Sequence, residues 1–185
     1  MESKPFFVKC LTNGNIIPLT SGNRFYFEKI VPLREDFIFL DGALEALKRF
    51  SQIFNRIIIV TNQQGIKKGI MTEQELISLH EYMISIIVNN GGKIDKIYYC
   101  TDLAISHSLY RKPNIGMALK AKKDFPEINF KKSIMVGDSI SDMQFGKKLN
   151  MLTVFISDSA ELPRKYPKLI DYSFRSLYDF SLLFK

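Results

Sequence analysis

The chain has 185 residues, 46% of them hydrophobic, so it is long enough for one buried core but too short for two large domains. It has no apolar run long enough to span a bilayer, its first residues lack the layout of a secretory signal, and two cysteines cannot build a disulfide framework. The net charge of +7 is compatible with an anionic partner, but the basic residues are scattered in pairs, which is typical of a solvated surface. We therefore expect one cytoplasmic domain over residues 1–185 that does not contact a membrane.

Strand-like and helix-like patterns alternate along the chain. Short β-branched runs that stop at turn residues indicate buried strands, and apolar residues spaced three and four apart indicate amphipathic helices. A capping-box pattern at Thr72 marks the start of the longest helix, and Asp41 is expected to cap the first one. In chain order, these signals predict a strand at residues 6–11, a helix at 41–54, a strand at 56–60, a helix at 72–89, a strand at 94–100, a helix at 114–125, a strand at 133–136, a helix at 141–149 and a strand at 152–156, followed by a loop, a short strand and a closing helix.

This alternation predicts the fold class. Strands that alternate with helices imply right-handed crossovers and a three-layer α/β sandwich, with a mostly parallel central sheet and helices on both faces. Ligands of such sheets bind at the carboxyl ends of the strands. Asn13, Thr61, Asn62 and Asp138 follow predicted strands, so we expect them to converge at that edge.

Three segments carry a family resemblance: residues 60–65 (Val-Thr-Asn-Gln-Gln-Gly), 111–113 (Arg-Lys-Pro) and 136–142 (Val-Gly-Asp-Ser-Ile-Ser-Asp). Their order and separation resemble the haloacid dehalogenase superfamily, in the branch that holds D,D-heptose 1,7-bisphosphate phosphatase and histidinol phosphatase. The resemblance implies a Rossmannoid fold without a large cap domain, a monomer, and a phosphorylated small molecule as ligand.

The resemblance also implies a phosphate-binding set. Thr61 and Asn62 would hold phosphoryl oxygens, Lys112 would balance their charge, and Arg111 would contact a substrate phosphate. Donors that are fixed in a dry cleft favour such an anion. The sequence therefore predicts a phosphate-binding cleft.

The catalytic part of the resemblance is incomplete. Lys112 and Asp138 would act in catalysis, and Asp142 would orient Lys112. The family's first motif, Asp-x-Asp-Gly-Thr, supplies a nucleophile and a general acid/base, but Leu11 and Asn13 stand at these two positions. A leucine has no lone pair with which to attack phosphorus, and a neutral amide has no usable acidic proton. We therefore expect a catalytically inactive protein that keeps its phosphate-binding cleft.

The same replacement affects metal binding. Magnesium is usually held by one or two carboxylates together with substrate oxygens, so a site that keeps Asp138 alone is expected to bind Mg²⁺ weakly. Zinc-containing members of the branch carry several cysteines and histidines before the Arg-Lys pair. Here Cys100 and His107 are the remaining candidates, and two ligands do not make a structural zinc site. We expect no zinc.

An active phosphatase with a substitute nucleophile stays open as a second interpretation. Cys10 would point to the opposite face of its strand from Leu11 unless a bulge turned it. Asp41 lacks a second carboxylate, because Ala43 stands where one would be needed.

A nucleic-acid 3′-phosphatase-like protein is a third interpretation. Residues 109–113 and 116–117 resemble the 3′-phosphatase domain of polynucleotide kinase, and the net charge is basic. Residues 138–146 look more like the heptose branch, so we rank nucleic acid below a phosphorylated small molecule or a protein partner.

Overall fold

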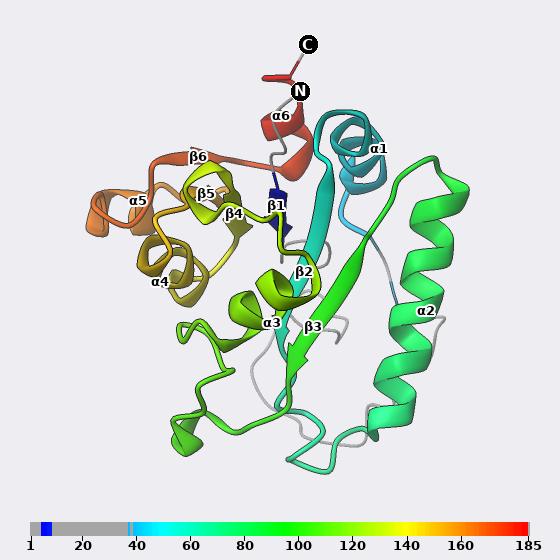
Figure 1. The fold of residues 1–185 in the computed structure, drawn as a ribbon. Coiled ribbons are helices and arrows are strands. Elements are labelled where there is room, and N and C mark those ends of the chain that lie inside the picture. Colours follow the sequence, from blue (N-terminus) through cyan, green and yellow to red (C-terminus); the bar gives the residue numbers. More distant parts are fainter. Residues whose placement is uncertain (1–4, 9–36, 38, 185) are drawn as a thin grey trace.

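A computed structural model of the chain describes residues 5–8, 37 and 39–184. The strands are β1 (Pro5–Val8), β2 (Arg56–Asn62), β3 (Lys96–Cys100), β4 (Ile134–Gly137), β5 (Leu152–Ile156) and β6 (Tyr172–Phe174). The α-helices are α1 (Ala43–Ile53), α2 (Glu73–Asn89), α3 (Gly116–Asp124), α4 (Ile140–Lys148), α5 (Glu161–Lys165) and α6 (Leu177–Ser181) (Figure 1). Two short 3₁₀ helices, η2 (Ala104–Ser106) and η3 (Phe130–Lys132), lie in the connections.

The six strands form one sheet in the order β3-β2-β1-β4-β5-β6, and each described pair is parallel. Strand order reverses at β1, because β2 and β3 lie on one side of it and β4, β5 and β6 on the other. Open parallel sheets bind ligands outside the carboxyl ends of their strands at such a reversal. The carboxyl ends of β2 and β4 flank that of β1.

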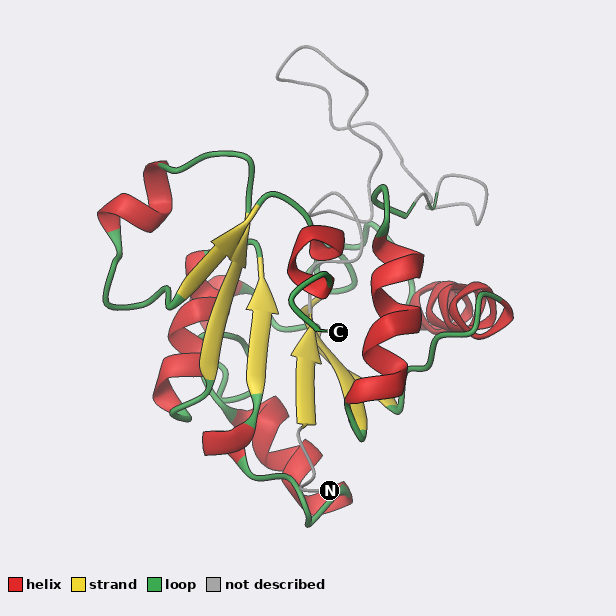
Figure 2. Ribbon diagram, turned by 90° about the horizontal axis from the view of Figure 1, so that it is seen from above, coloured by secondary structure: helices red, strands yellow, loops and turns green. Residues whose placement is uncertain are grey.

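The sheet is buried on both faces, which confirms the predicted α/β sandwich. Ile57 and Ile59 of β2 belong to one core, with α1, α2 and α6, whereas Ile58 and Val60 belong to the other, with α3 and α4. Successive side chains of a strand point to opposite faces, so a continuous apolar run serves both cores. Figure 2 shows the strands between the two sets of helices.

Of the two predicted helix caps, the structure confirms one and contradicts the other. The Thr72 capping box is present and begins α2. The residue that precedes α1 is Gly42, with φ 73° and no side-chain cap, so the expectation that Asp41 caps this helix is wrong. A Cβ on Gly42 would lie 2.7 Å from the Cβ of Tyr178 in α6, and this close approach explains the glycine.

The third helix starts two residues later than predicted, at Gly116 rather than residue 114. The preceding residues instead close a turn, in which the Asn114 N–H donates to the Arg111 carbonyl at 2.8 Å. Only the Pro5–Val8 part of the first strand lies inside the described residues. Within those residues, no helix combines the length and the apolar character needed to cross a bilayer.

Candidate functional site

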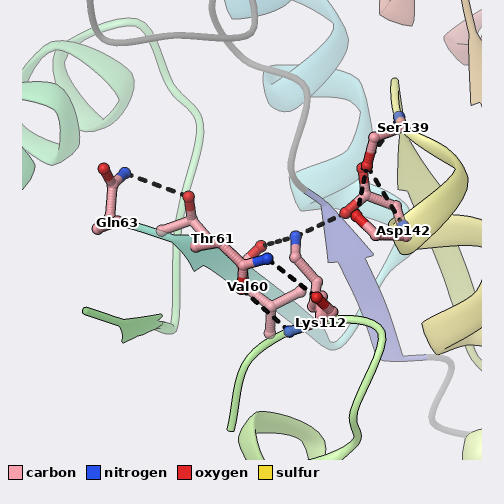
Figure 3. A network of polar contacts seen from close by, with 8 residues as sticks. Val60, Thr61, Gln63, Lys112, Ser139 and Asp142 are labelled. Carbon is pink, nitrogen blue, oxygen red and sulfur yellow. Dashed lines mark hydrogen bonds and ion pairs between the residues drawn. The ribbon is translucent and has the colours of Figure 1, made fainter. Parts of the chain in front are cut away.

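A buried ion pair lies beside the carboxyl ends of β2 and β4. The Lys112 Nζ is 2.7 Å from Asp142 Oδ1, and the two side chains are 1% and 0% exposed (Figure 3). The same ammonium donates to the Val60 carbonyl of β2 at 2.5 Å. Burying a charge is costly unless it is paired and hydrogen-bonded, so this lysine and this carboxylate depend on each other.

The first turn of α4 fixes Asp142. Its Oδ2 accepts hydrogen bonds from the Ser139 N–H at 3.1 Å and the Ser139 hydroxyl at 2.6 Å. The Asp142 N–H in turn donates to the Ser139 hydroxyl oxygen at 3.4 Å, which completes a capping box. Gly137 makes room for it, because a Cβ there would lie 2.5 Å from the Asp142 Cβ. The Gly-Asp-Ser-x-x-Asp pattern is therefore both a helix cap and the support of the ion pair.

The side chain of Asn62 holds the main chain of Lys112. Asn62 Oδ1 accepts from the Lys112 N–H at 3.0 Å, and Asn62 Nδ2 donates to the Lys112 carbonyl at 3.1 Å. These two hydrogen bonds fix both the position and the orientation of the Lys112 main chain. The structure thus places the Asn62 side chain on Lys112, and a contact between Asn62 and phosphate stays a prediction.

Thr61 and Arg111 lie next to this clamp. The Thr61 hydroxyl accepts from Gln63 Nε2 at 3.2 Å. Arg111 Nη1 donates to the Asp102 carbonyl at 2.9 Å, and Nη2 donates to Gln64 Oε1 at 3.4 Å. Arg111 therefore joins the loop after β2 to the loop after β3, a link that the sequence did not reveal.

Asp138 directly follows β4 and is half-buried, whereas Leu11 and Asn13 lie outside the described residues. Magnesium would need more oxygen donors than Asp138 supplies, and Asp142 is engaged with Lys112 and Ser139. In the described ranges, no group of three or more His, Cys, Asp and Glu residues could hold a metal ion. Weak magnesium binding at Asp138 stays a prediction.

The loop after β3 contains the two remaining zinc candidates. Cys100 is buried, and its thiol donates to Asp102 Oδ2 at 3.6 Å and lies 3.9 Å from the Ser108 hydroxyl. Hydrogen bonding from Ser108 lowers the pKa of Asp102. His107 is exposed, with φ 48°. Cys100 thus contacts oxygen-bearing side chains.

The structure brings some of the expected site residues together more directly than others. Asp142 and Asn62 both contact Lys112, and Thr61 follows the Val60 carbonyl that Lys112 binds. The Val60 carbonyl had no signal in the sequence. Ser139, also absent from the expected set, could have been found from its capping-box spacing to Asp142.

Comparisons with known proteins identify the family of the chain. The family model described as polynucleotide kinase 3 phosphatase matches residues 16–175. The D-glycero-alpha-D-manno-heptose-1,7-bisphosphate 7-phosphatase of Campylobacter jejuni is 39% identical over 129 residues, which cover 70% of this chain and 73% of the relative. The D-glycero-beta-D-manno-heptose-1,7-bisphosphate 7-phosphatase of Pasteurella multocida is 32% identical over 158 residues, which cover 82% and 85%.

A solved structure shares the fold. The D,D-heptose 1,7-bisphosphate phosphatase from B. bronchiseptica, complexed with magnesium and phosphate, superposes with a TM-score of 0.76 at 19% identity, covering 98% of this chain and 97% of that one. The parallel sheet, the retained motif segments and the extended sequence matches lead to one assignment. The chain belongs to the polynucleotide kinase 3 phosphatase family and, within the haloacid dehalogenase superfamily, to the heptose bisphosphate phosphatase branch.

Proposed function

We propose that this protein binds a phosphorylated sugar or a similar phosphorylated small molecule, and that it hydrolyses phosphomonoesters at no more than a background rate. One combination of observations supports the proposal. The buried Lys112–Asp142 pair is fixed at the strand ends, whereas residues 9–15 (Lys-Cys-Leu-Thr-Asn-Gly-Asn) contain no carboxylate. The charge that would face a phosphate is kept, and the groups that would break its ester bond are replaced.

The supporting geometry favours binding. Lys112 is held at its main chain by Asn62 and at its ammonium by Val60 and Asp142, so its charge is fixed before a ligand arrives. Asp142 balances part of the Lys112 charge, so the advantage of this lysine over mobile surface lysines lies in its fixed position in a site shielded from water. Thr61 adds a hydroxyl at the same edge of the sheet.

The chemistry expected at the first motif argues against efficient turnover. A leucine at position 11 cannot form a phosphoryl-enzyme bond, and an asparagine at position 13 cannot protonate the leaving oxygen. General acid–base help alone is worth about 10²–10⁴ in rate. Weak magnesium binding would reduce the rate further, because the ion would lose a carboxylate ligand.

The names of the relatives suggest the first ligand to test. The proteins of Campylobacter jejuni and Pasteurella multocida are both named as heptose-1,7-bisphosphate 7-phosphatases. We therefore propose a sugar bisphosphate of this class as ligand, and inorganic phosphate as the minimal probe of the cleft.

Calorimetry and a phosphate-release assay on the purified protein with magnesium test the proposal. Heptose bisphosphate should bind saturably without measurable turnover across a panel of phosphomonoesters. Thr61→Val and Arg111→Gln should each weaken binding about tenfold, as expected for the loss of one hydrogen bond to a charged group. Turnover that Asp138→Ala abolishes would contradict the proposal, because contaminating phosphatase would not respond to that change.

Nucleic-acid end binding is a second candidate, favoured by the description of the matching family model and by the net charge of +7. A 3′-phosphorylated oligonucleotide would then bind with an affinity that falls steeply as salt is added. Absence of binding at low salt would remove this candidate.

An active phosphatase with a substitute nucleophile would form a phosphoryl-enzyme that can be trapped.

A further inference from the structure

A pocket of about 400 Å³ lies between α3 and the loop that precedes it. Its wall is preformed, because the Gly116 N–H donates to the Leu109 carbonyl at 2.9 Å and a Cβ on Gly116 would lie 2.6 Å from that oxygen. Asn114 Nδ2 also donates to the Ser108 carbonyl at 2.9 Å. The loop is thus fastened to the first turn of α3, and the volume falls within the range of ligand sites.

Large apolar side chains around this pocket face solvent. Leu109 is 75% exposed, Leu119 is 53% exposed and Tyr110 is 43% exposed. Single exposed apolar residues are ordinary on a protein surface, whereas several around one concavity form a candidate interaction site. The pocket therefore offers an apolar surface that a ligand could cover.

The charged groups around the pocket all have one sign. Lys120, Lys123 and Lys148 line it, and none of the lining residues that the structure describes is acidic. In the part of the chain that the structure describes, no carboxylate forms an ion pair with any of these three lysines. Lys120 Nζ lies 4.5 Å from the ring centroid of Tyr110, and Lys148 donates to Asn114 Oδ1 at 3.3 Å. Asp124 interacts electrostatically with Lys123, but the three lysines outnumber this carboxylate, so the rim stays positive and attracts an anionic ligand.

The lining distinguishes between classes of anionic ligand. A sugar phosphate needs hydrogen-bond partners for its hydroxyls, but the Asn114 amide already binds Ser108 and Lys148. A nucleobase needs an open aromatic face, and Lys120 lies over the Tyr110 ring. A second copy of this chain carries the same charge of +7 and would be repelled. An acidic peptide with an apolar side chain matches both the apolar surface and the lysines.

We propose that this pocket docks an acidic segment of a partner protein. A leucine or phenylalanine of the partner would cover Leu109 and Leu119, and flanking aspartates or glutamates would face Lys120, Lys123 and Lys148. Charge complementarity of this kind raises the association rate and selects the partner, while the apolar anchor carries most of the affinity. The proposal does not depend on whether the phosphate cleft binds or hydrolyses its ligand.

Selection from a phage-displayed random peptide library on the immobilised full-length protein tests the proposal. The recovered peptides should share an apolar anchor flanked by acidic residues. In fluorescence polarisation, Leu119→Ser should weaken the binding of these peptides about tenfold, and the double variant Lys120→Glu/Lys123→Glu should weaken it by at least as much. Added salt should also weaken binding, because the charges lie at the rim.

The double variant Lys131→Glu/Lys168→Glu is the matched control, because both lysines are exposed, neither lines the pocket, and the change of charge equals that of the double pocket variant. It should leave affinity unchanged, and all these surface variants should keep the melting temperature of the parent. Selection that recovers no acidic and apolar consensus would overturn the proposal, as would peptides that bind the double variant as tightly as the parent. Displacement of the peptides by a single-stranded oligonucleotide that binds more tightly would assign the surface to nucleic acid instead.

Discussion

At the scale of single residues, the Lys112–Asp142 pair determines how strongly a substitution in the site lowers the free energy of unfolding. Asp142→Asn should destabilise the fold by about 3–5 kcal/mol, because it leaves a buried ammonium without its counter-charge. Lys112→Met should have a smaller effect when it is added to Asp142→Asn than when it is made alone. Urea unfolding of the four proteins measures the coupling free energy, which we expect to be about 1–3 kcal/mol.

Asparagine is the appropriate replacement because it keeps an oxygen that can accept from Ser139, so the cap of α4 is preserved. The exposed i,i+4 pair of Glu45 and Arg49 provides the control. Its removal should change stability by about 0.5 kcal/mol or less. Additive effects of the two site substitutions would contradict the interdependence of Lys112 and Asp142.

The first-motif residues provide a gain-of-function prediction. If Leu11 and Asn13 are the reason for low activity, Leu11→Asp/Asn13→Asp should raise phosphomonoester turnover at least about 100-fold over the parent. The rate should depend on magnesium, because the new carboxylate adds an oxygen ligand. A phosphate-release assay measures the change.

Leu11→Asp alone should gain much less activity, since it restores a nucleophile without its acid/base partner. Adding Asp138→Ala to the double variant should remove the gain. A double variant that folds, binds phosphate and stays inactive would show that some other feature limits catalysis.

The residues of this site could be identified from the sequence, but not all of their contacts could be predicted. Lys112 and Asp142 lie in two separate recognisable motifs, and the family resemblance implied that Asp142 orients Lys112. The clamp of Asn62 on the Lys112 main chain joins residues that are 50 positions apart. The link from Arg111 to Gln64 likewise depends on how two loops meet. Local patterns contain no signal for such contacts.

At the scale of elements, local rules predicted α2 better than α3. The capping box at Thr72 lies within one helix turn, so its sequence spacing determines its geometry. The start of α3 depends instead on the Gly116 N–H, which binds the Leu109 carbonyl across the loop. This contact between the loop and the helix overrides helix propensity, which is only a weak predictor of where a helix begins.

Close packing of α4 on the sheet yields a prediction about Gly146. A Cβ there would lie 2.7 Å from Thr153 Cγ2 and 2.9 Å from the Met135 Cβ. Thr153 cannot easily rotate, because its hydroxyl donates to the Leu169 carbonyl at 2.7 Å and accepts from the Asp171 N–H at 3.2 Å. Alanine favours a helix by about 1 kcal/mol over glycine, but overpacking costs about 1–3 kcal/mol. Gly146→Ala should therefore destabilise the protein in urea unfolding.

Gly65→Ala is the matched control, because the nearest atom to its Cβ would be 3.8 Å away, on Met71. This substitution should leave stability unchanged or raise it slightly by restricting the unfolded chain. An equal effect of the two alanines would show that contact with the sheet does not determine the response at Gly146.

At the scale of the whole molecule, helices cover both faces of the sheet because its strands are apolar on both faces. Residues 57–60 are apolar without interruption, and they fill two cores because their side chains alternate between faces. Composition and periodicity were sufficient to predict this arrangement. The pocket beside α3 was not predictable, since it arises where a loop, an exposed helix face and the end of α4 meet.

We expect stability at acid pH to depend on His80, which lies in α2 beside the ring of Tyr99, with 5.7 Å between ring centroids. Burial lowers the pKa of His80 from 6.5 to about 4. Below pH 6.5 the unfolded chain therefore binds a proton that the folded protein does not, and stability falls with pH until the folded state is protonated near pH 4. The loss should reach about 2 kcal/mol by pH 5.

Urea unfolding of the parent and of His80→Phe between pH 7 and pH 5 measures this loss. Phenylalanine keeps an aromatic ring beside Tyr99 and removes the titrating group, so the variant should lose much less stability over this interval. Asp124 and Glu127 act at lower pH, because hydrogen bonds from Lys96 and Arg56 hold their pKa values below the ordinary carboxyl range. Their contribution is lost only as those carboxylates become protonated. If the free energies of unfolding of parent and variant followed parallel curves against pH above pH 5, His80 would be excluded as the cause. Curves that converge near pH 7 and diverge towards pH 5 would identify the burial of His80 as the origin of the acid sensitivity.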